Sequence, residues 1–139
     1  MQTKIPFRNH APHGWWVATY ILRAAWDDQA EPVEDEACCA WENTILLQAD
    51  HRETAYSKAQ AFAAEACTEF EDTSDPTRKG KWVLEGLTSL LPIYEEFEDG
   101  AEIIWTEYAS IPVQKIRSWI RPKERLEAFD DTPGRAELG

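Results

Sequence analysis

A dense group of carboxylate side chains lies between residues 95 and 105, in the stretch EEFEDGAEIIW. Its five carboxylates belong to Glu95, Glu96, Glu98, Asp99 and Glu102. A calcium loop of the EF-hand type alternates its oxygen ligands over about twelve residues, and this spacing does not follow that pattern. Asp-Gly dipeptides supply the positive backbone angles that tight hairpins need. The stretch therefore predicts a solvated hairpin turn at Asp99-Gly100, with a strand on either side.

The other residue types that could support chemistry do not form a recognised pattern. His10 and His13 have no cysteine at zinc spacing, and Cys38-Cys39 lacks the C-x-x-C spacing of a redox pair. Cys67 falls in an apolar stripe and is predicted to be a small core residue. P-loop, G-x-S-x-G and H-E-x-x-H motifs are absent from the sequence. We therefore predict no catalytic residue, metal site or cofactor, and an enzyme with an unfamiliar site stays open as the alternative.

The charge is concentrated in the middle of the chain. The net charge is −12, but residues 26 to 110 hold 21 acidic and 5 basic residues, a net −16. Such a field repels nucleic acid and anionic membranes, attracts basic proteins, and also keeps a protein in solution. The charge predicts a protein partner with a basic surface. The candidate partner-binding residues are these carboxylates and two tryptophans beside charge: Asp27, Asp28, Glu34, Asp35, Glu36, Trp41, Glu98, Asp99 and Trp119.

A length of 139 residues is typical of one domain. The longest apolar run, WWVATYIL, is much shorter than the roughly 20 residues of a membrane span. The first residues lack the apolar core of a secretory signal, and three cysteines do not make a disulfide framework. We expect a cytoplasmic protein.

The first half of the chain alternates between polar and apolar segments. Residues 1–13 read as an N-terminal arm, and the aromatic and β-branched run 15–26 predicts a buried strand. A second strand is predicted at 42–49. Asp50 and Glu53 then match a capping box, which predicts a helix from about residue 51 to Phe70 with an apolar stripe along it.

The second half predicts further strands and one more helix. KWVLEGLTSLL has β-type composition, and Pro92 predicts an edge position or a bend between two strands. Residues 111–129 place Val113, Ile116 and Trp119 at helical spacing among basic residues, which predicts a basic amphipathic helix broken or bent near Pro122. This helix could mediate self-association. Residues 130–139 read as a tail.

Four segments of the chain also resemble a known family. They are WWVATYIL, ENTILLQAD continuing into ETAYSKA, KWVLEGL, and IYEEFEDGAEI, whose turn contains Asp99, Gly100 and Glu102. Their order is similar to that of a bacterial family catalogued as domain of unknown function 4288, over about residues 14–108. The resemblance implies a shared fold, while the acidic insertion after Trp26 and the helix after Pro112 depart from the family pattern.

Together these features predict an α+β protein with an antiparallel four- to five-stranded sheet, one long helix packed on a face and an additional C-terminal amphipathic helix. The predicted α+β domain covers residues 14–110. For function, we expect a small acidic protein-binding module, of an inhibitor or immunity type, that neutralises a basic partner. The alternative is an enzyme or small-ligand-binding domain with an unrecognised site.

Overall fold

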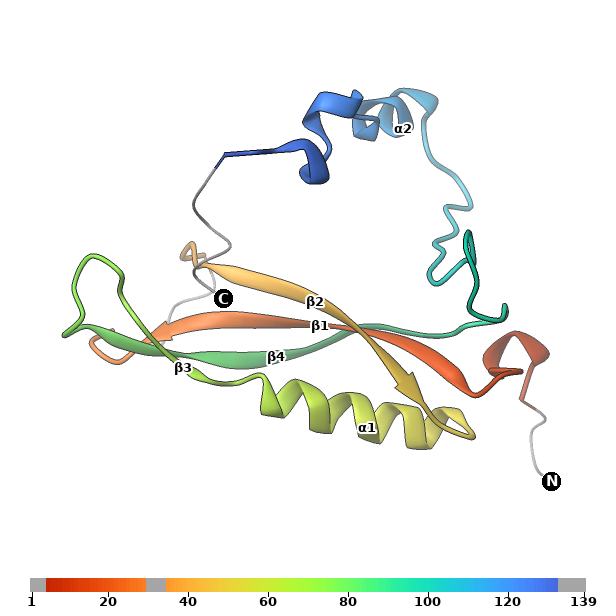
Figure 1. Ribbon diagram of the computed structural model, residues 1–139, viewed down its shortest axis with the longest axis horizontal. Helices are drawn as coiled ribbons and strands as arrows, with labels where there is room; N and C mark the ends of the chain where they lie inside the picture. Colours follow the sequence, from red (N-terminus) through yellow and green to blue (C-terminus); the bar gives the residue numbers. More distant parts are fainter. Residues whose placement is uncertain (1–4, 30–34, 133–139) are drawn as a thin grey trace. The chain divides into compact units, whose positions relative to one another are not determined.

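The computed structural model describes residues 5–29 and 35–132 (Figure 1). The chain divides into two units, Met1–Trp105 and Thr106–Gly139. The first unit holds four strands and a helix: β1 (Trp15–Trp26), β2 (Ala40–Gln48), α1 (Arg52–Glu65), β3 (Glu69–Glu71) and β4 (Lys79–Pro92). The second holds α2 (Val113–Trp119) and two 3-10 turns. Among the described residues, no helix is long and apolar enough to cross a bilayer.

The four strands form one antiparallel sheet in the order β2-β1-β4-β3. This confirms an α+β chain with a four-stranded antiparallel sheet and two α-helices, and β1 has the predicted bounds. Side chains alternate between the two sides of a strand, so Trp16, Ala18 and Tyr20 share one side. We call this the Trp16 side of the sheet. Leu47 of β2 lies on it too, since its register partner is Trp16.

Strand β4 carries two extra residues relative to β1, and these control where its leucines point. Thr88 and Glu85 have no partner in β1, where the register shifts after Thr19 and after Ile21. Each extra residue reverses the alternation once. Leucines spaced three apart along β4 therefore all reach the Trp16 side: Leu84, Leu87 and Leu90. Pro92 ends β4, at a point where β3 no longer pairs with that strand.

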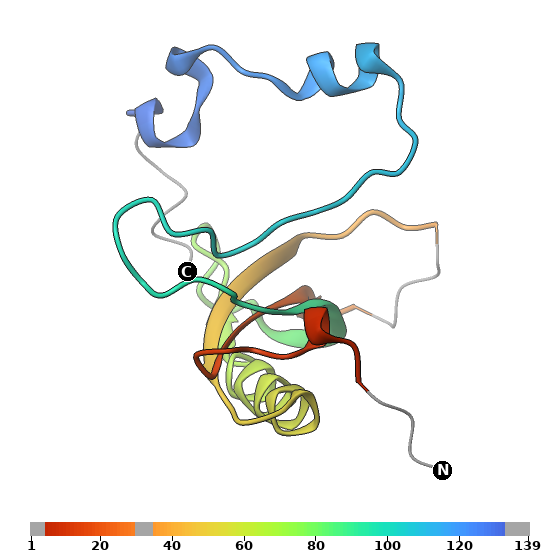
Figure 2. The same ribbon diagram turned by 90° about the vertical axis from the view of Figure 1, so that its right-hand side faces the viewer.

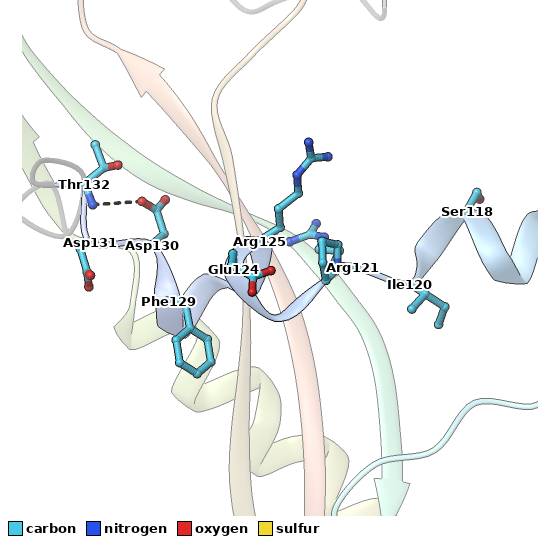
Figure 3. Close-up of a pocket in the computed structure, with 10 residues that line it drawn as sticks. Ser118, Ile120, Arg121, Glu124, Arg125, Phe129, Asp130, Asp131 and Thr132 are labelled. Carbon is cyan, nitrogen blue, oxygen red and sulfur yellow. Dashed lines mark hydrogen bonds between the residues drawn. The ribbon is translucent and has the colours of Figure 1, made fainter.

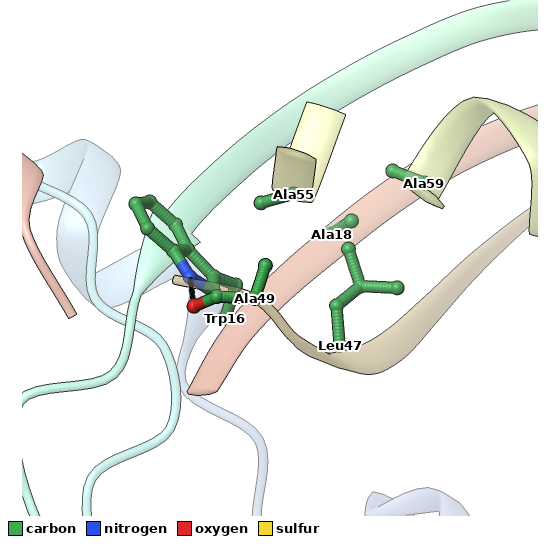
Figure 4. Close-up of a cluster of buried hydrophobic side chains, with 6 residues drawn as sticks. All are labelled: Trp16, Ala18, Leu47, Ala49, Ala55 and Ala59. Atoms are coloured by element: carbon green, nitrogen blue, oxygen red, sulfur yellow. Dashed lines mark hydrogen bonds between the residues drawn. The ribbon is translucent and has the colours of Figure 1, made fainter. Parts of the chain in front are cut away.

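The helix α1 packs against the strands through small residues. Ala55, Ala59 and Ala63 are fully buried, and the first two cluster with Trp16, Ala18, Leu47 and Ala49 (Figure 4). The Trp16 indole Nε1 donates a hydrogen bond of 3.0 Å to the Ala49 carbonyl, so the polar atom of this buried ring is satisfied. Alanine lets a helix backbone approach a sheet closely. Figure 2 shows α1 lying along one side of the curved strands.

The start of this helix near residue 51 is confirmed, but the predicted capping residue and the predicted end were wrong. The N-cap is His51, whose ring accepts from the Thr54 amide at 3.5 Å, rather than Asp50 of the predicted capping box. The helix ends at Glu65, five residues before the predicted Phe70, which lies in β3 instead. Cys67 follows the helix and is exposed, which corrects its assignment to the core.

The reason for the early stop is a hairpin between β3 and β4. Opposite charges face each other across it, with Glu69 opposite Lys81 and Glu71 opposite Lys79. Its turn is closed by side chains that accept from the backbone two residues ahead: Asp72 from Ser74 at 2.9 Å and Asp75 from Thr77 at 3.1 Å. Because residues 69–71 pair with β4 and these hydrogen bonds close the turn after them, the helix does not continue to Phe70.

The hairpin predicted around Asp99-Gly100 is only partly present. The turn exists, because Ala101 donates to the Glu98 carbonyl at 3.0 Å and Gly100 has a φ of 87°. The flanking segments 93–98 and 101–110 are not strands, so the predicted extra strands were wrong. Ile93 is nonetheless buried, and its amide donates to the Trp15 carbonyl at 2.9 Å. This single backbone hydrogen bond does not extend β4, because the register between β1 and β4 ends at Trp16 and Pro92.

The N-terminal residues contact this same end of the sheet. Phe7–Asn9 form a 3-10 turn, and the Tyr94 hydroxyl donates to the Arg8 carbonyl. The Ala49 amide donates to the Gly14 carbonyl at 2.9 Å, so the start of β1 is joined to the end of β2.

The second unit contains less helix than predicted. α2 spans only Val113–Trp119, followed by 3-10 turns at Lys123–Arg125 and Glu127–Phe129. The predicted break near Pro122 is present, but the chain leaves the helix already at Ile120, which is extended. The residue before a proline is restricted away from helical angles, and this explains extended geometry reaching back from Pro122. The Trp119 ring lies 5.3 Å from that of Tyr108.

Candidate functional site

The Trp16 side of the sheet extends beyond the end of α1. After Ala66 the chain turns, and the Thr68 carbonyl accepts from the Trp82 amide at 3.0 Å as β3 begins. Leu22, Ala24 and Trp26 of β1 continue the alternation past this point. Their partners on the neighbouring strands are Trp41, Trp82 and Gly80, and Gly80 faces Phe70. Residues opposite one another in a sheet share a side, so the register gathers four aromatic side chains here.

These four rings form a continuous series, which we call the aromatic row. The Trp41 and Trp82 ring centroids lie 6.3 Å apart, edge to face. Phe70 lies 5.1 Å from Trp82 and 4.9 Å from Trp26. These separations are those of favourable aromatic pairs. Trp41 is 40% exposed, while the other three rings are half-buried.

Gly80 makes room for one ring of the row. It is buried, and a Cβ atom at this position would lie 2.8 Å from Phe70 Cζ and 2.8 Å from the Ala25 carbonyl oxygen. Both distances are too short for a real contact. The absence of a side chain at Gly80 is therefore what lets Phe70 lie across β4 between Trp82 and Trp26.

A cation is already stacked at one end of the row. The Arg78 guanidinium carbon lies 3.9 Å from the Trp26 ring centroid. Its Nε is 3.0 Å from Asp28 Oδ2, and its Nη1 is 3.6 Å from Asp72 Oδ2. Hydrogen bonds from the Ser74 hydroxyl and amide lower the pKa of Asp72, and Arg78 adds to the effect. Two ionised carboxylates thus orient one guanidinium over an indole.

The predicted partner-binding carboxylates fall into two separate groups. Asp27 and Asp28 follow β1, while Asp35 and Glu36 precede β2, and all four are exposed. Asp27 and Glu36 both line a hollow of about 700 Å³ that also includes Arg23 and Lys81. Glu34 lies outside the described residues.

Glu98 and Asp99 lie at the other end of the sheet. The neighbouring Phe97 stacks on Trp15 at 5.1 Å, so this turn is beside the start of β1. The twelve residues of β1 span roughly 35 Å at about 3.3 Å each, and this length separates the two acidic groups. Trp119 belongs to the second unit and is 46% exposed. The structure therefore brings Asp27 and Glu36 together in one hollow, away from Glu98 and Asp99.

A hollow also lies within the second unit. It measures about 930 Å³ and is lined by residues between Ser118 and Thr132 (Figure 3). Every lining side chain is exposed, and Arg125 and Phe129 point in opposite directions. Asp130 accepts from the Thr132 amide at 3.0 Å, and hydrogen bonds from Thr132 lower its pKa. A ligand site needs converging, partly enclosed polar groups, and this hollow does not provide them.

The histidine, cysteine and carboxylate side chains of the described residues are the remaining candidates for metal or nucleophilic chemistry. That part of the chain has no group of three or more His, Cys, Asp or Glu side chains placed to hold a metal ion. The exposed Cys67 thiol donates to the Ala63 carbonyl at 3.6 Å, which is an ordinary bond to the preceding helical turn.

The aromatic row is not apparent in the sequence. The sequence predicts Phe70 at the end of a helix, Trp82 within a segment of β-type composition, and Trp26 and Trp41 beside the acidic insertion. The one available signal was the alternation of EFE with KGK, which places Phe70 and Gly80 on one side of a hairpin and four charges on the other. The strand register, which brings Trp41 and Trp82 to either side of β1, is not visible in any single segment.

Comparison with protein families agrees with the resemblance seen in the sequence. A family model described as Domain of unknown function (DUF4288) matches residues 15–105. The chain belongs to this family. The DUF4288 match begins with β1 and includes the whole sheet, α1, the turn at Asp99 and every ring of the aromatic row. It leaves α2 outside. Neither the curated proteins nor the solved structures contain a match to the chain.

Proposed function

We propose that this DUF4288 protein is a small protein-binding module that neutralises a basic partner, as an inhibitor or immunity-type protein of the cytoplasm. The observation that carries the proposal is the grouping of exposed carboxylates beside a partly exposed tryptophan. Asp27 and Glu36 are exposed and line one hollow with Trp26, and Trp41 on the neighbouring strand β2 is 40% exposed. Aromatic residues at the centre of an interface commonly contribute most of its binding energy, and surrounding charge selects the partner.

The surplus of charge supports the same proposal. Asp28 is already paired with Arg78, but Asp27, Asp35 and Glu36 have no ion-pair partner among the described residues. A field of net −16 over residues 26–110 accelerates association with a basic surface, and salt screens this effect.

The test is capture of binding proteins from a lysate of the native host, with nuclease, at low and at high salt. We expect the full chain to retain one basic protein in stoichiometric amount and to release it at high salt. A triple variant, Asp27→Asn with Asp35→Asn and Glu36→Gln, should lose that protein. The matched control is Glu98→Gln with Asp99→Asn, which removes charge at the other end of the sheet and should retain it. Retention that ignores salt, or equal loss in both variants, would argue against the proposal.

Self-association through α2 is a second candidate function. The apolar residues of this helix are exposed, at 59% for Val113, 41% for Ile116 and 46% for Trp119. Exposed apolar side chains at helical spacing are typical of helix pairing. We expect the full chain to form a dimer in analytical ultracentrifugation and Ile116→Glu to return it to a monomer. Lys115→Glu is the control for the change of charge, and a monomeric wild type would dismiss this candidate.

A further inference from the structure

We propose that the aromatic row is a stacking site for arginine side chains of a basic peptide, and that Trp41 is the ring that receives the incoming guanidinium. The inference rests on the proposed function, because it names the chemical group of the basic partner that the site recognises. It adds a site that charge alone does not predict.

Trp41 is the most exposed ring of the aromatic row. Three rings are half-buried and support one another, whereas Trp41 at the β2 end is 40% exposed. Its ring is held edge to face by Trp82, so the ring is positioned before any ligand arrives. A preorganised ring loses little conformational entropy on binding.

An arginine of the chain itself already stacks at the opposite end of the row. Arg78 stacks on Trp26 at 3.9 Å while Asp28 and Asp72 hold its nitrogen atoms. Arginine combines a planar surface for stacking with donors for carboxylates at its edge. Exposed carboxylates are also present at this end of the sheet, because Asp27 and Glu36 line one hollow with Trp26.

Arginine fits this region better than other ligands that stack on aromatic rings, because of its charge and its planar shape. A nucleic-acid base also stacks on tryptophan, but its phosphate would meet a region with a net charge of −16. Lysine matches the charge but lacks the planar group. Charge complementarity and shape together favour a guanidinium.

The experiment measures the affinity of the full chain for three labelled peptides of equal length by fluorescence anisotropy. The peptides are oligo-arginine, oligo-lysine and oligo-citrulline, the last being neutral and nearly the same shape as arginine. We expect oligo-arginine to bind more tightly than oligo-lysine and oligo-citrulline to show no binding.

Variants at Trp41 then isolate the stacking contact. Trp41→Leu keeps apolar bulk but removes the ring, and it should weaken oligo-arginine binding roughly fivefold, the equivalent of the ~1 kcal/mol of a cation–π contact. Trp41→Phe should recover most of the affinity. Leu46→Ala is the matched control, because Leu46 is 49% exposed on the same strand but on the side away from Trp16. Circular dichroism checks that each variant folds.

The outcomes separate this inference from the proposed function. If oligo-lysine binds as tightly as oligo-arginine, or if Trp41→Leu binds as the wild type does, the stacking site is wrong while acidic recognition stands. If neither basic peptide binds at low salt, both proposals fail.

Discussion

The two ends of the sheet are built from the same kinds of residue and have different surroundings. At the start of β1, Trp16 is 2% exposed and packs with the alanines of α1. At the other end, beyond the last residue of α1, Trp41 is 40% exposed, and the neighbouring Trp82 ring is half-buried against Tyr20, Leu22 and Ala63. We call these the closed end and the open end. Trp16 and Trp41 are the same residue type, so the length of α1, more than residue type, decides which of the two belongs to the core.

The closed end and the open end should also contribute differently to folding stability and to binding. The closed end satisfies its one buried indole with a backbone carbonyl and is filled by alanines. The open end holds partly exposed rings beside ionised groups, which contribute less to folding but can contact another molecule. Substitutions at the two ends should therefore differ in what they change.

The largest expected effect comes from truncating the same residue type at each end. Trp16→Ala removes a fully buried ring and its hydrogen bond, and should lower the free energy of unfolding by about 3–5 kcal/mol. Trp41→Ala should lower it by only about 1 kcal/mol, the scale of one aromatic pair. Urea denaturation followed by circular dichroism measures both values. Equal losses would remove the distinction between the ends.

The next effect tests the close approach of α1 to the strands. Ala59→Leu adds bulk at a position with 0% exposure, so we expect a loss of about 1–3 kcal/mol in the free energy of unfolding. Ala61→Leu is the matched control, since Ala61 is exposed on the same helix and leucine is nearly as good a helix former as alanine. Thermal unfolding compares the two. A neutral Ala59→Leu would mean that the helix packs loosely.

A smaller effect is expected from Gly80→Ala at the open end. The added methyl group would overlap Phe70, while the lower entropy of the unfolded chain offsets part of the cost by about 0.4–1 kcal/mol. We expect a net destabilisation of about 1 kcal/mol and a change in near-ultraviolet circular dichroism as the rings move. Lys79→Ala, at an exposed neighbouring position, is the control. An unchanged aromatic spectrum would show that the row does not depend on Gly80.

The smallest effect concerns Asp72 and pH. Its pKa is lowered in the folded protein by Ser74 and Arg78, so its contribution to stability is present above its unfolded pKa, about 3.8, and is lost as the pH falls through the lower folded value. Asp72→Asn should therefore be slightly less stable than the wild type at pH 6, and the two should converge below pH 3. Denaturant midpoints across this range measure the difference. A gap that persists at the lowest pH would assign the effect to geometry instead of charge.

Much of the first unit could be predicted from local patterns. The β-branched and aromatic run of β1 and the alternation of Ile45 and Leu47 in β2 specify strands within their own residues. The helix was predictable for the same reason, and so was the turn at Asp99-Gly100. The predicted strands beside that turn failed because a turn motif does not provide the neighbouring strand that its flanks would need.

The sequence by itself determined β1, β2, β4, the start of the helix, the acidic field and membership of DUF4288, because each depends on residues that are close together or on their total number. Only the tertiary structure decided that α1 stops at Glu65, that two extra residues turn three leucines of β4 to one side, and that Trp41, Trp82, Phe70 and Trp26 become neighbours. The physical reason is register. A shift of one residue between two strands moves every side chain to the opposite side, and the pairing that sets it lies between segments far apart in the chain.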